Sequence, residues 1–207
     1  MQSRPTVVVL AAGKGSRFKG GAHKLEQTVG ELSVLGRTLL NAVHSHLPVV
    51  VVTTPALAAL AQRVVAETDV VVVPPALAAL GMGHSIAAGI AARADAPGWL
   101  LLPGDMPMVR PATMLAVAAA LEHHAVAYAQ YHGRRGHPVG FAAELYSELM
   151  LLSGDEGARR IVARYPAVGV DVEDEGVLLD LDTEADLAAI RALHAAAQQP
   201  RAASGEA

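Results

Sequence analysis

The apolar residues of this chain fall into short, valine-rich runs, each separated from the next by a longer segment rich in alanine and leucine. The clearest runs are VVVLAA (7–12), PVVVVTT (48–54), DVVVVPP (69–75) and GWLLLPGD (98–105). β-Branched residues favour strands, and an apolar run without alternation is typical of a strand that is buried on both faces of a sheet. We therefore expect these four runs to be central strands of a mainly parallel sheet.

The segments between the runs have helical composition. We expect helices over 35–47, 56–68, 81–94 and 110–124, the last with a proline near its first turn, where proline is tolerated. Strands that alternate with helices imply a sheet with helices on both faces. The pattern thus predicts an α/β fold with three layers and a doubly wound, mainly parallel sheet.

Shorter elements follow in the second half of the chain. We expect strands over 125–133, 138–143 and 168–173, two helices within 144–166 and a helix over 185–198. No linker or repeat of solenoid period divides the chain. We therefore predict a single domain over 1–198, followed by a small, polar, disordered tail over 199–207.

Composition and charge exclude several classes of protein. Of 207 residues, 52% are hydrophobic but only 3% aromatic, so the core must be built from Ala, Val and Leu. A net charge of -4 argues against a general nucleic-acid binder. The absence of cysteine excludes disulfides, thiolate nucleophiles and Cys-ligated metal sites. Apolar runs too short for a membrane span and the lack of a signal-peptide pattern lead us to expect a cytoplasmic protein.

Ligands of an open α/β sheet bind at the carboxyl ends of its strands. Three loops would meet there: AAGKGSR after the first strand, PPALAALGMGHS after the third and PGDMP after the fourth. Gly13 and Gly15 would let backbone N–H groups turn toward a ligand, while Arg17 and Lys24 would neutralise an anion. A polyphosphate would satisfy both features, although a tight turn with solvated cations gives the same pattern.

Two general phosphate-binding patterns do not fit this loop. In G-x-G-x-x-G, Phe18 would stand at the third glycine and obstruct close packing of helix on strand. In G-x-x-x-x-G-K-[ST], Gly21 and Ala22 stand where Lys and Ser/Thr belong. The first failure argues against an oxidoreductase that holds a dinucleotide on this fold.

The loop instead resembles LAAG-x-G/S-x-R-M-G followed by K-L, a motif of the molybdenum-cofactor nucleotidyltransferase (NTP transferase) family. Similar blocks follow in the family's order: GMGHSIAAGI (81–90), PGDMPMV (103–109), GHPVGF (136–141), GDEGARRI (154–161) and LLDLDTEADL (178–187). Within this family the chain is most similar to the cytidylyltransferases, because it has LAAG where the guanylyltransferases usually have LAGG. The resemblance implies a Rossmann-like fold of the nucleotide-diphospho-sugar transferase type.

The same resemblance implies transfer of CMP from CTP to the phosphate of molybdopterin or molybdenum cofactor, with release of pyrophosphate and with Mg²⁺ as cofactor. A client molybdoenzyme or its chaperone is a further partner that the resemblance implies. Three alternatives stay open: a guanylyltransferase or another NTP transferase with a different phosphate acceptor, a dinucleotide-binding oxidoreductase, and a silent nucleotide-binding regulator.

Two carboxylates are the implied Mg²⁺ ligands. Asp105 follows an apolar strand at the expected edge of the sheet, where an Asx-turn or a helix cap is the alternative role. Asp182 is the implied second ligand, although Asp182 or Thr183 would also serve as the cap of the next helix. Asp180, two residues earlier on what we expect to be the same strand face, is a weaker choice.

The resemblance assigns the triphosphate and the base to residues of all three loops. Arg17 would bind the leaving phosphates and Lys24 the α-phosphate, so that Arg17, Lys24 and Asp105 are the implied catalytic residues. Ser85 would either cap a helix or bond the base or ribose. The full set of implied nucleotide-binding residues is Leu10, Ala11, Ala12, Gly13, Gly15, Arg17, Lys24, Gly81, Met82, Ser85, Pro103 and Gly104.

The acceptor side is implied to contain His137, Pro138, Asp155 and Arg159. A lone histidine is commonly structural or exposed, and the spacing of the nine histidines forms no metal cluster. The family pattern moves His137 to the acceptor side, where it would hold the incoming phosphate or relay a proton.

Overall fold

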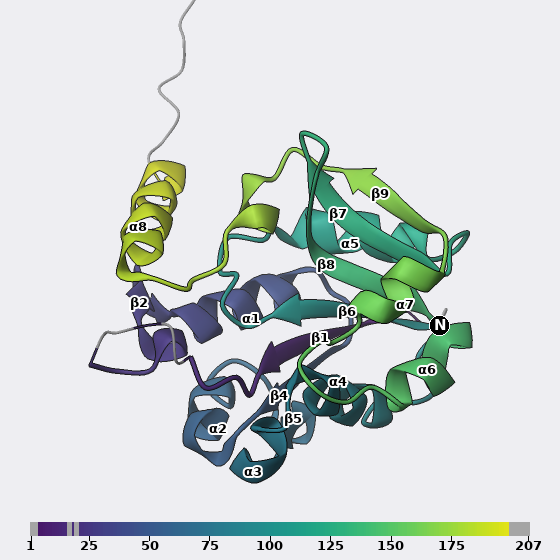
Figure 1. The fold of residues 1–207 in the computed structure, drawn as a ribbon. Helices are drawn as coiled ribbons and strands as arrows, with labels where there is room; N and C mark the ends of the chain where they lie inside the picture. The colour runs from purple at the N-terminus through teal and green to yellow at the C-terminus, as the bar shows by residue number, and fades with distance from the viewer. Residues whose placement is uncertain (1–3, 16–17, 19–20, 199–207) are drawn as a thin grey trace, which may run out of the picture.

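The computed structural model describes residues 4–15, 18 and 21–198 (Figure 1). Over these residues the chain forms one large sheet in the order β5-β4-β1-β6-β8-β7-β9 and a small hairpin of β2 and β3. Its strands are β1 Thr6–Ala11, β2 Thr28–Val29, β3 Leu32–Ser33, β4 Val49–Thr53, β5 Val70–Val72, β6 Gly98–Pro103, β7 Val126–Tyr131, β8 Arg134–Ala142 and β9 Ala167–Asp171. Within the large sheet, β8 runs antiparallel to β6 and β7 and the other pairs are parallel, so the predicted mainly parallel sheet is confirmed.

Helices cover both faces of this sheet. The helical segments are η1 Lys24–Glu26, α1 Val34–His44, α2 Pro55–Ala61, η2 Glu67–Asp69, α3 Pro75–Ala78, α4 Met82–Ala91, α5 Pro111–Ala120, η3 Ala143–Leu145, α6 Tyr146–Met150, α7 Arg159–Arg164, η4 Glu175–Leu178 and α8 Glu184–Gln198. Val7 and Val9 of β1 belong to a core cluster with residues of α1, α2, α5 and α8. Val8, which points the other way, packs with residues of α4, α6 and α7. The strand is apolar throughout because both of its faces are buried, as the sequence predicts.

The order of the strands creates a crevice at the middle of the sheet. From β1 the chain passes through α1 to β4 on one side, whereas β6, reached later through α4, pairs with the other side of β1. In doubly wound sheets this point of reversal leaves a crevice outside the carboxyl ends of the two central strands. The loops that follow β1 and β6 therefore meet at one place.

Several predicted elements differ from the structure at their ends. The helix expected over 56–68 ends at Ala61, and Val65 is buried in a core cluster instead. The strand expected to run to Pro75 ends at Val72, because two consecutive prolines cannot donate to a sheet and the second begins α3. The β2–β3 hairpin, α3 and η4 are too short to give a periodic pattern in the sequence.

The predicted tail over 199–207 lies outside the described residues, so the predicted domain limits stay a prediction. In the part of the chain that the structure describes, no helix combines the length and the apolar character needed to cross a membrane.

Candidate active site

The loop that carries Asp105 begins where β6 ends and is fixed to its neighbours through the backbone. The Gly104 N–H donates to the carbonyl of Leu10 on β1, at 2.8 Å. The Asp105 carbonyl accepts a hydrogen bond from the N–H of Leu181, at 3.1 Å. Two segments far apart in the sequence are thus tied to the same loop, one on each side.

Lys24 links this loop to the segment before α8. Its ammonium group donates to Asp105 Oδ2 at 2.6 Å, to the Leu181 carbonyl at 2.8 Å and to Asp182 Oδ1 at 3.0 Å. Burial lowers the pKa of Lys24, but the charges and hydrogen bonds of Asp105 and Asp182 outweigh it and raise the pKa above its usual value. The ammonium is therefore charged at neutral pH and balances the two carboxylates.

Local structure explains why Lys24 has this position. It begins the short helix η1, whose first turn is capped by the side chain of His23, which accepts a hydrogen bond from the Leu25 N–H and whose own N–H donates to the carboxylate of Glu26. Leu25 is buried in the core and anchors the turn. The lysine side chain is thereby directed toward the carboxylates.

The second carboxylate oxygen of Asp105 differs from the first, which accepts a hydrogen bond from Lys24. Asp105 Oδ1 is buried and has no hydrogen-bond partner among the described residues. An unpaired carboxylate oxygen is costly to bury unless it binds something else. No group of three or more His, Cys, Asp and Glu side chains within the described ranges forms a complete metal cage. Mg²⁺ requires less, since it commonly takes one or two carboxylates and completes its shell with water and substrate phosphates. Asp105 and Asp182 fit that requirement.

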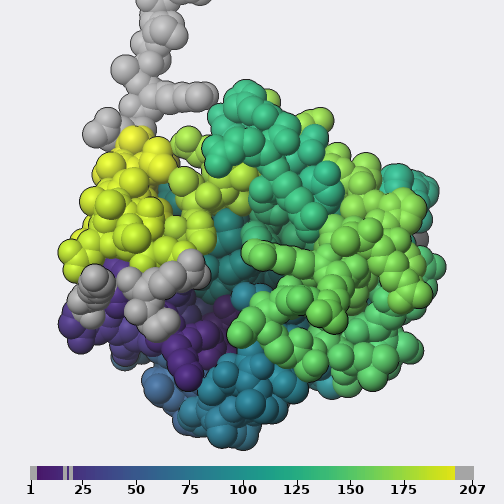
Figure 2. Space-filling view, in the orientation of Figure 1, coloured from purple at the N-terminus to yellow at the C-terminus, as the bar shows by residue number. Residues whose placement is uncertain are grey.

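A cavity of about 350 Å³ opens beside these residues, and Figure 2 shows a hollow in the middle of this face, between the N-terminal loops, α8 and the segment around 150–160. It is lined by Leu10, Ala12, Gly13, Lys14, Gly15, Lys24, Leu25, Ala78, Ala79, Gly81, Met82, Ser85, Pro103, Asp105, Asp155 and Asp182. The three predicted loops therefore meet, as expected. Of the predicted nucleotide residues, Ala11 is buried in the core on the other side of β1, and Gly104 is buried beneath the lining.

Four lining residues were not predicted from the sequence. Lys14 and Leu25 lie within the motif that follows the first strand, and this position could have indicated that they line the cavity. Ala78 and Ala79 lie at the end of α3, where an alanine-rich sequence gives no indication of a binding role. Small side chains at these positions leave space in the cavity.

Ser85 does not cap a helix. Helix α4 begins at Met82 after Gly81, which occupies the N-cap position with a φ of 121°, a conformation that favours glycine. Ser85 lies in the first turn of the helix and faces the cavity. The predicted capping role is wrong, and the predicted contact of Ser85 with the base or ribose stays a prediction.

The segment 180–183 has no regular structure, so the strand face that we expected for Asp180 and Asp182 is absent. Thr183 takes the capping role before α8: its hydroxyl accepts from the Asp186 N–H, and the Asp186 carboxylate accepts from the Thr183 N–H and hydroxyl. Asp182 is directed to Lys24 and lines the cavity, whereas Asp180 is not part of the lining.

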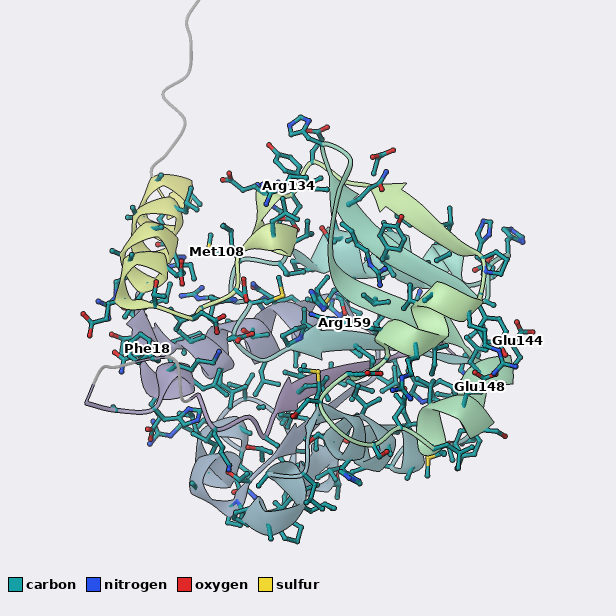
Figure 3. All side chains as sticks on the ribbon, in the orientation of Figure 1. Phe18, Met108, Arg134, Glu144, Glu148 and Arg159 are labelled. Carbon is teal, nitrogen blue, oxygen red and sulfur yellow. The ribbon has the colours of Figure 1, made fainter. Side chains whose placement is uncertain are left out.

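The predicted acceptor residues lie on the β8 and α7 side. His137 lies on β8, and burial, together with the positive charge of Arg135 and, to a smaller extent, of Arg159, outweighs Asp180 and lowers its pKa to about 4. Figure 3 shows Arg159 directed from α7 toward the middle of the molecule. Pro138 is buried next to His137. Asp155 lines the cavity described above and also a second one, of about 620 Å³, between α6 and α7.

Arg17 lies outside the described residues, and its predicted role stays a prediction. Phe18 is described, and it is buried in the core cluster that contains Leu25.

Comparison with known proteins agrees with this geometry. The model of the MobA-like NTP transferase domain matches residues 7–170. The bifunctional protein GlmU of Cereibacter sphaeroides is 36% identical over 129 residues, which are 60% of this chain and 28% of that protein. This chain thus spans little more than a quarter of the length of that curated relative.

Solved structures match over a larger share of the chain. The crystal structure of Rv0371c from Mycobacterium tuberculosis is 30% identical, covers 92% of this chain and 99% of its own, and superposes with a TM-score of 0.79. A complex of the same protein with manganese is 29% identical, with the same coverage and a TM-score of 0.76. Molybdopterin-guanine dinucleotide biosynthesis protein A from Archaeoglobus fulgidus is 17% identical, covers 92% of this chain and 99% of its own, and shares the fold with a TM-score of 0.68.

Proposed function

Because the chain belongs to the MobA-like NTP transferase domain family, whose members are nucleotidyltransferases, we propose that it transfers CMP from CTP to the phosphate of molybdopterin or molybdenum cofactor. An oxygen of the acceptor phosphate would attack the α-phosphorus of CTP. A new P–O bond would form, the bond between the α-phosphorus and the bridging oxygen would break, and pyrophosphate would leave with that electron pair.

One observation carries this proposal: Lys24 joins Asp105 and Asp182 at the crevice between β1 and β6, with Asp105 Oδ1 buried and unpaired. Among the described lining residues, the lysines Lys14 and Lys24 face three aspartates. A triphosphate would be repelled by this set unless a divalent cation neutralised the carboxylates.

Asp105 and Asp182 would hold Mg²⁺, which when bound supplies positive charge to the phosphate oxygens. Lys24 would bind the α-phosphate, and Arg17, by the family resemblance, the leaving phosphates. The residues bring two anions together and hold them in line, and positioning with charge neutralisation supplies most of the catalysis in such transfers.

We propose that the choice of base depends on the wall of the cavity that the end of β1 forms. Ala12 lines the cavity and carries a methyl group at the position where the guanylyltransferases usually have glycine. Ala78, Ala79 and Pro103 add small, apolar surfaces. We propose that this wall admits cytosine and disfavours guanine, with Ser85 bonding the base or ribose.

The acceptor would approach from the β8 and α7 side. His137, neutral above a pKa of about 4, would hold or relay a proton, and Arg159 would bind the anionic acceptor. Pro138 would shape this surface, and Asp155, which lines both cavities, would face both substrates.

Nucleotide choice is tested by thermal unfolding with Mg²⁺ and each of the four NTPs in turn. A ligand at a hundred times its Kd stabilises the folded state by about 2.7 kcal/mol, which in a chain of this size raises Tm by about 5–10 °C. We expect CTP to give the largest rise and, with molybdopterin, the fastest release of pyrophosphate. A larger effect of GTP would overturn the base assignment, and Ala12→Gly should move the preference toward GTP.

The metal site is tested with Asp105→Asn, which keeps the shape of the side chain and removes its charge. We expect pyrophosphate release to fall at least a hundredfold at any Mg²⁺ concentration, since the variant loses one of the two proposed metal ligands and the charge of one of the partners of Lys24. Asp171→Asn, at an exposed position on β9, is the control and should keep full activity. Normal turnover by Asp105→Asn would remove this residue from the site.

A further inference from the structure

The loop that carries Asp105 lies against helix α1 (Figure 1). Side chains of that helix donate hydrogen bonds to carbonyl groups of the loop. The Thr38 hydroxyl is 3.0 Å from the carbonyl of Gly104, immediately before Asp105. The Asn41 side-chain amide donates at 2.9 Å to the carbonyl of Pro107 and at 3.1 Å to that of Val109, after Asp105. The two residues are three positions apart and therefore share one face of the helix.

The two side chains differ in how many hydrogens they have to donate to their carbonyl partners. The Asn41 amide has two N–H groups, one for each carbonyl, so both of its donors are used. Thr38 has one hydroxyl proton, which it shares between Gly104 and the Val34 carbonyl of its own helix, also at 3.0 Å. Thr38 is fully buried, so the Gly104 carbonyl has no water to replace a lost hydroxyl.

We propose that Thr38 and Asn41 are positioning residues for Asp105, and that they set the affinity of the site for a divalent cation. The backbone on both sides of Asp105 is fixed to a rigid helix, and the carboxylate is presented in one orientation. Neither residue lines the cavity. This inference rests on the proposed function, because it takes Asp105 as a metal ligand.

The burial of the Asp105 carboxylate explains why its loop needs the hydrogen bonds from Thr38 and Asn41. Asp105 Oδ1 is buried without a hydrogen-bond partner in the described part of the chain, so relaxation of the loop would let it turn toward water. Residues behind metal ligands commonly change metal affinity 10–100-fold when they are removed. Thr38 and Asn41 lie behind Asp105 in the same way, because they contact its loop and not the cavity.

The experiment measures binding of Mn²⁺ alone by electron paramagnetic resonance, without nucleotide or turnover. We expect Thr38→Val and Asn41→Asp to weaken Mn²⁺ binding about 10–100-fold. The first replaces a hydroxyl by a methyl group of equal size, and the second replaces the donor amide by an acceptor that faces two carbonyls. Thr38→Ser restores the hydroxyl and should restore wild-type affinity.

Ser45→Ala is the matched control. It removes a buried hydroxyl from the residue that follows the same helix, where the Ser45 side chain donates to the Ala42 carbonyl, and it leaves the Asp105 loop untouched. We expect this variant to lose stability but to bind Mn²⁺ as the wild type does.

The outcomes separate this inference from the proposed function. If the wild type binds no Mn²⁺, the proposed metal site fails. If the wild type binds Mn²⁺ and Thr38→Val and Asn41→Asp bind it equally well, the metal site stands and the positioning role is overturned. Loss of affinity that Ser45→Ala shares, or that Thr38→Ser does not repair, likewise contradicts a positioning role and indicates a general loss of structure.

Discussion

At the scale of the residue, Lys24 has one observed role, as the partner of two carboxylates, and one proposed role, at the α-phosphate, and the two exclude each other. Its ammonium group bonds Asp105 and Asp182, the two carboxylates that we propose as metal ligands. A cation that binds both carboxylates would compete with the lysine for them. Lys24 is therefore expected to leave the carboxylates when the metal and nucleotide bind, and so to become available to the α-phosphate.

This competition predicts opposite effects of Lys24→Met on binding and on transfer. We expect pyrophosphate release to fall at least a hundredfold, because the charge at the α-phosphate is lost. In the nucleotide-free protein we expect tighter Mn²⁺ binding than in the wild type, because two carboxylates lose their internal counter-ion. Both are measured directly, one by pyrophosphate assay and the other by electron paramagnetic resonance.

Lys14→Met is the control, since it removes a positive charge from the same cavity at a residue that is exposed. It should leave Mn²⁺ affinity without nucleotide nearly unchanged. Weaker Mn²⁺ binding by Lys24→Met than by the wild type would show that the lysine supports the metal and does not compete with it.

At the scale of the element, the start of α4 is pressed against the loop before α7. The Gly83 N–H donates to the Gly154 carbonyl at 2.9 Å. A Cβ at Gly83 would lie 2.5 Å from the backbone nitrogen of Ser153, and one at Gly81 would lie 2.2 Å from the carbonyl carbon of Gly154. Glycine is required here by the close approach of two backbones, which brings Asp155 to the cavity.

Gly83→Ala should therefore separate the two segments. We expect a loss of about 1–3 kcal/mol of unfolding free energy from overpacking, and weaker CTP binding because the start of α4 forms part of the cavity. Urea unfolding measures the first and thermal shift with CTP the second. Gly21→Ala, where an added Cβ meets open space, is the control and should change neither. If Gly83→Ala lost stability but kept its affinity for CTP, this contact would have no part in forming the site.

Local patterns in the sequence predicted the strands well and the contacts between distant segments poorly. The valine runs predict β1 and β4 because burial on both faces leaves few other residue types acceptable. The link from Lys24 to Asp182 spans 158 positions, and no local periodicity describes such a pair. Asp182 was ambiguous because Thr183 also fits a helix cap, and only the packing assigns the cap to Thr183.

The support behind Asp105 could not be predicted for a different reason. In the sequence, Thr38 and Asn41 are ordinary polar residues of a helix, and their partners are backbone carbonyls, which any residue type provides. Their role appears once α1 is placed next to the end of β6. Side chains that act on a backbone leave no motif, whereas glycine-rich and Asp-containing loops do.

At the scale of the whole molecule, the sheet joins a parallel half, β5-β4-β1-β6, to a half that contains the antiparallel strand β8. The cavity lies over the first half, and His137 lies on β8 at the start of the second. Net charge is negative, yet Arg135 and Arg159 both act on His137. A positive environment on the second half suits an anionic acceptor and also makes a charged imidazole unfavourable there.

That environment predicts how stability depends on pH. Burial and Arg135 lower the pKa of His137 from 6.5 to about 4 in the folded state, so between these values the unfolded chain binds the proton more readily. Stability from the neutral imidazole is fully present above pH 6.5 and is lost as the pH falls toward 4, at up to about 1.4 kcal/mol per pH unit.

The variant His137→Gln should lack this loss of stability. Urea unfolding at pH 7 and pH 5 measures this effect. Between these two pH values the unfolding free energy of the wild type should fall by more than that of His137→Gln. His123→Gln, at an exposed position after α5, is the reference for removing an imidazole. Parallel pH profiles for the wild type and His137→Gln would mean that His137 is charged or solvated in the folded protein, and the acceptor side would then lose its neutral histidine.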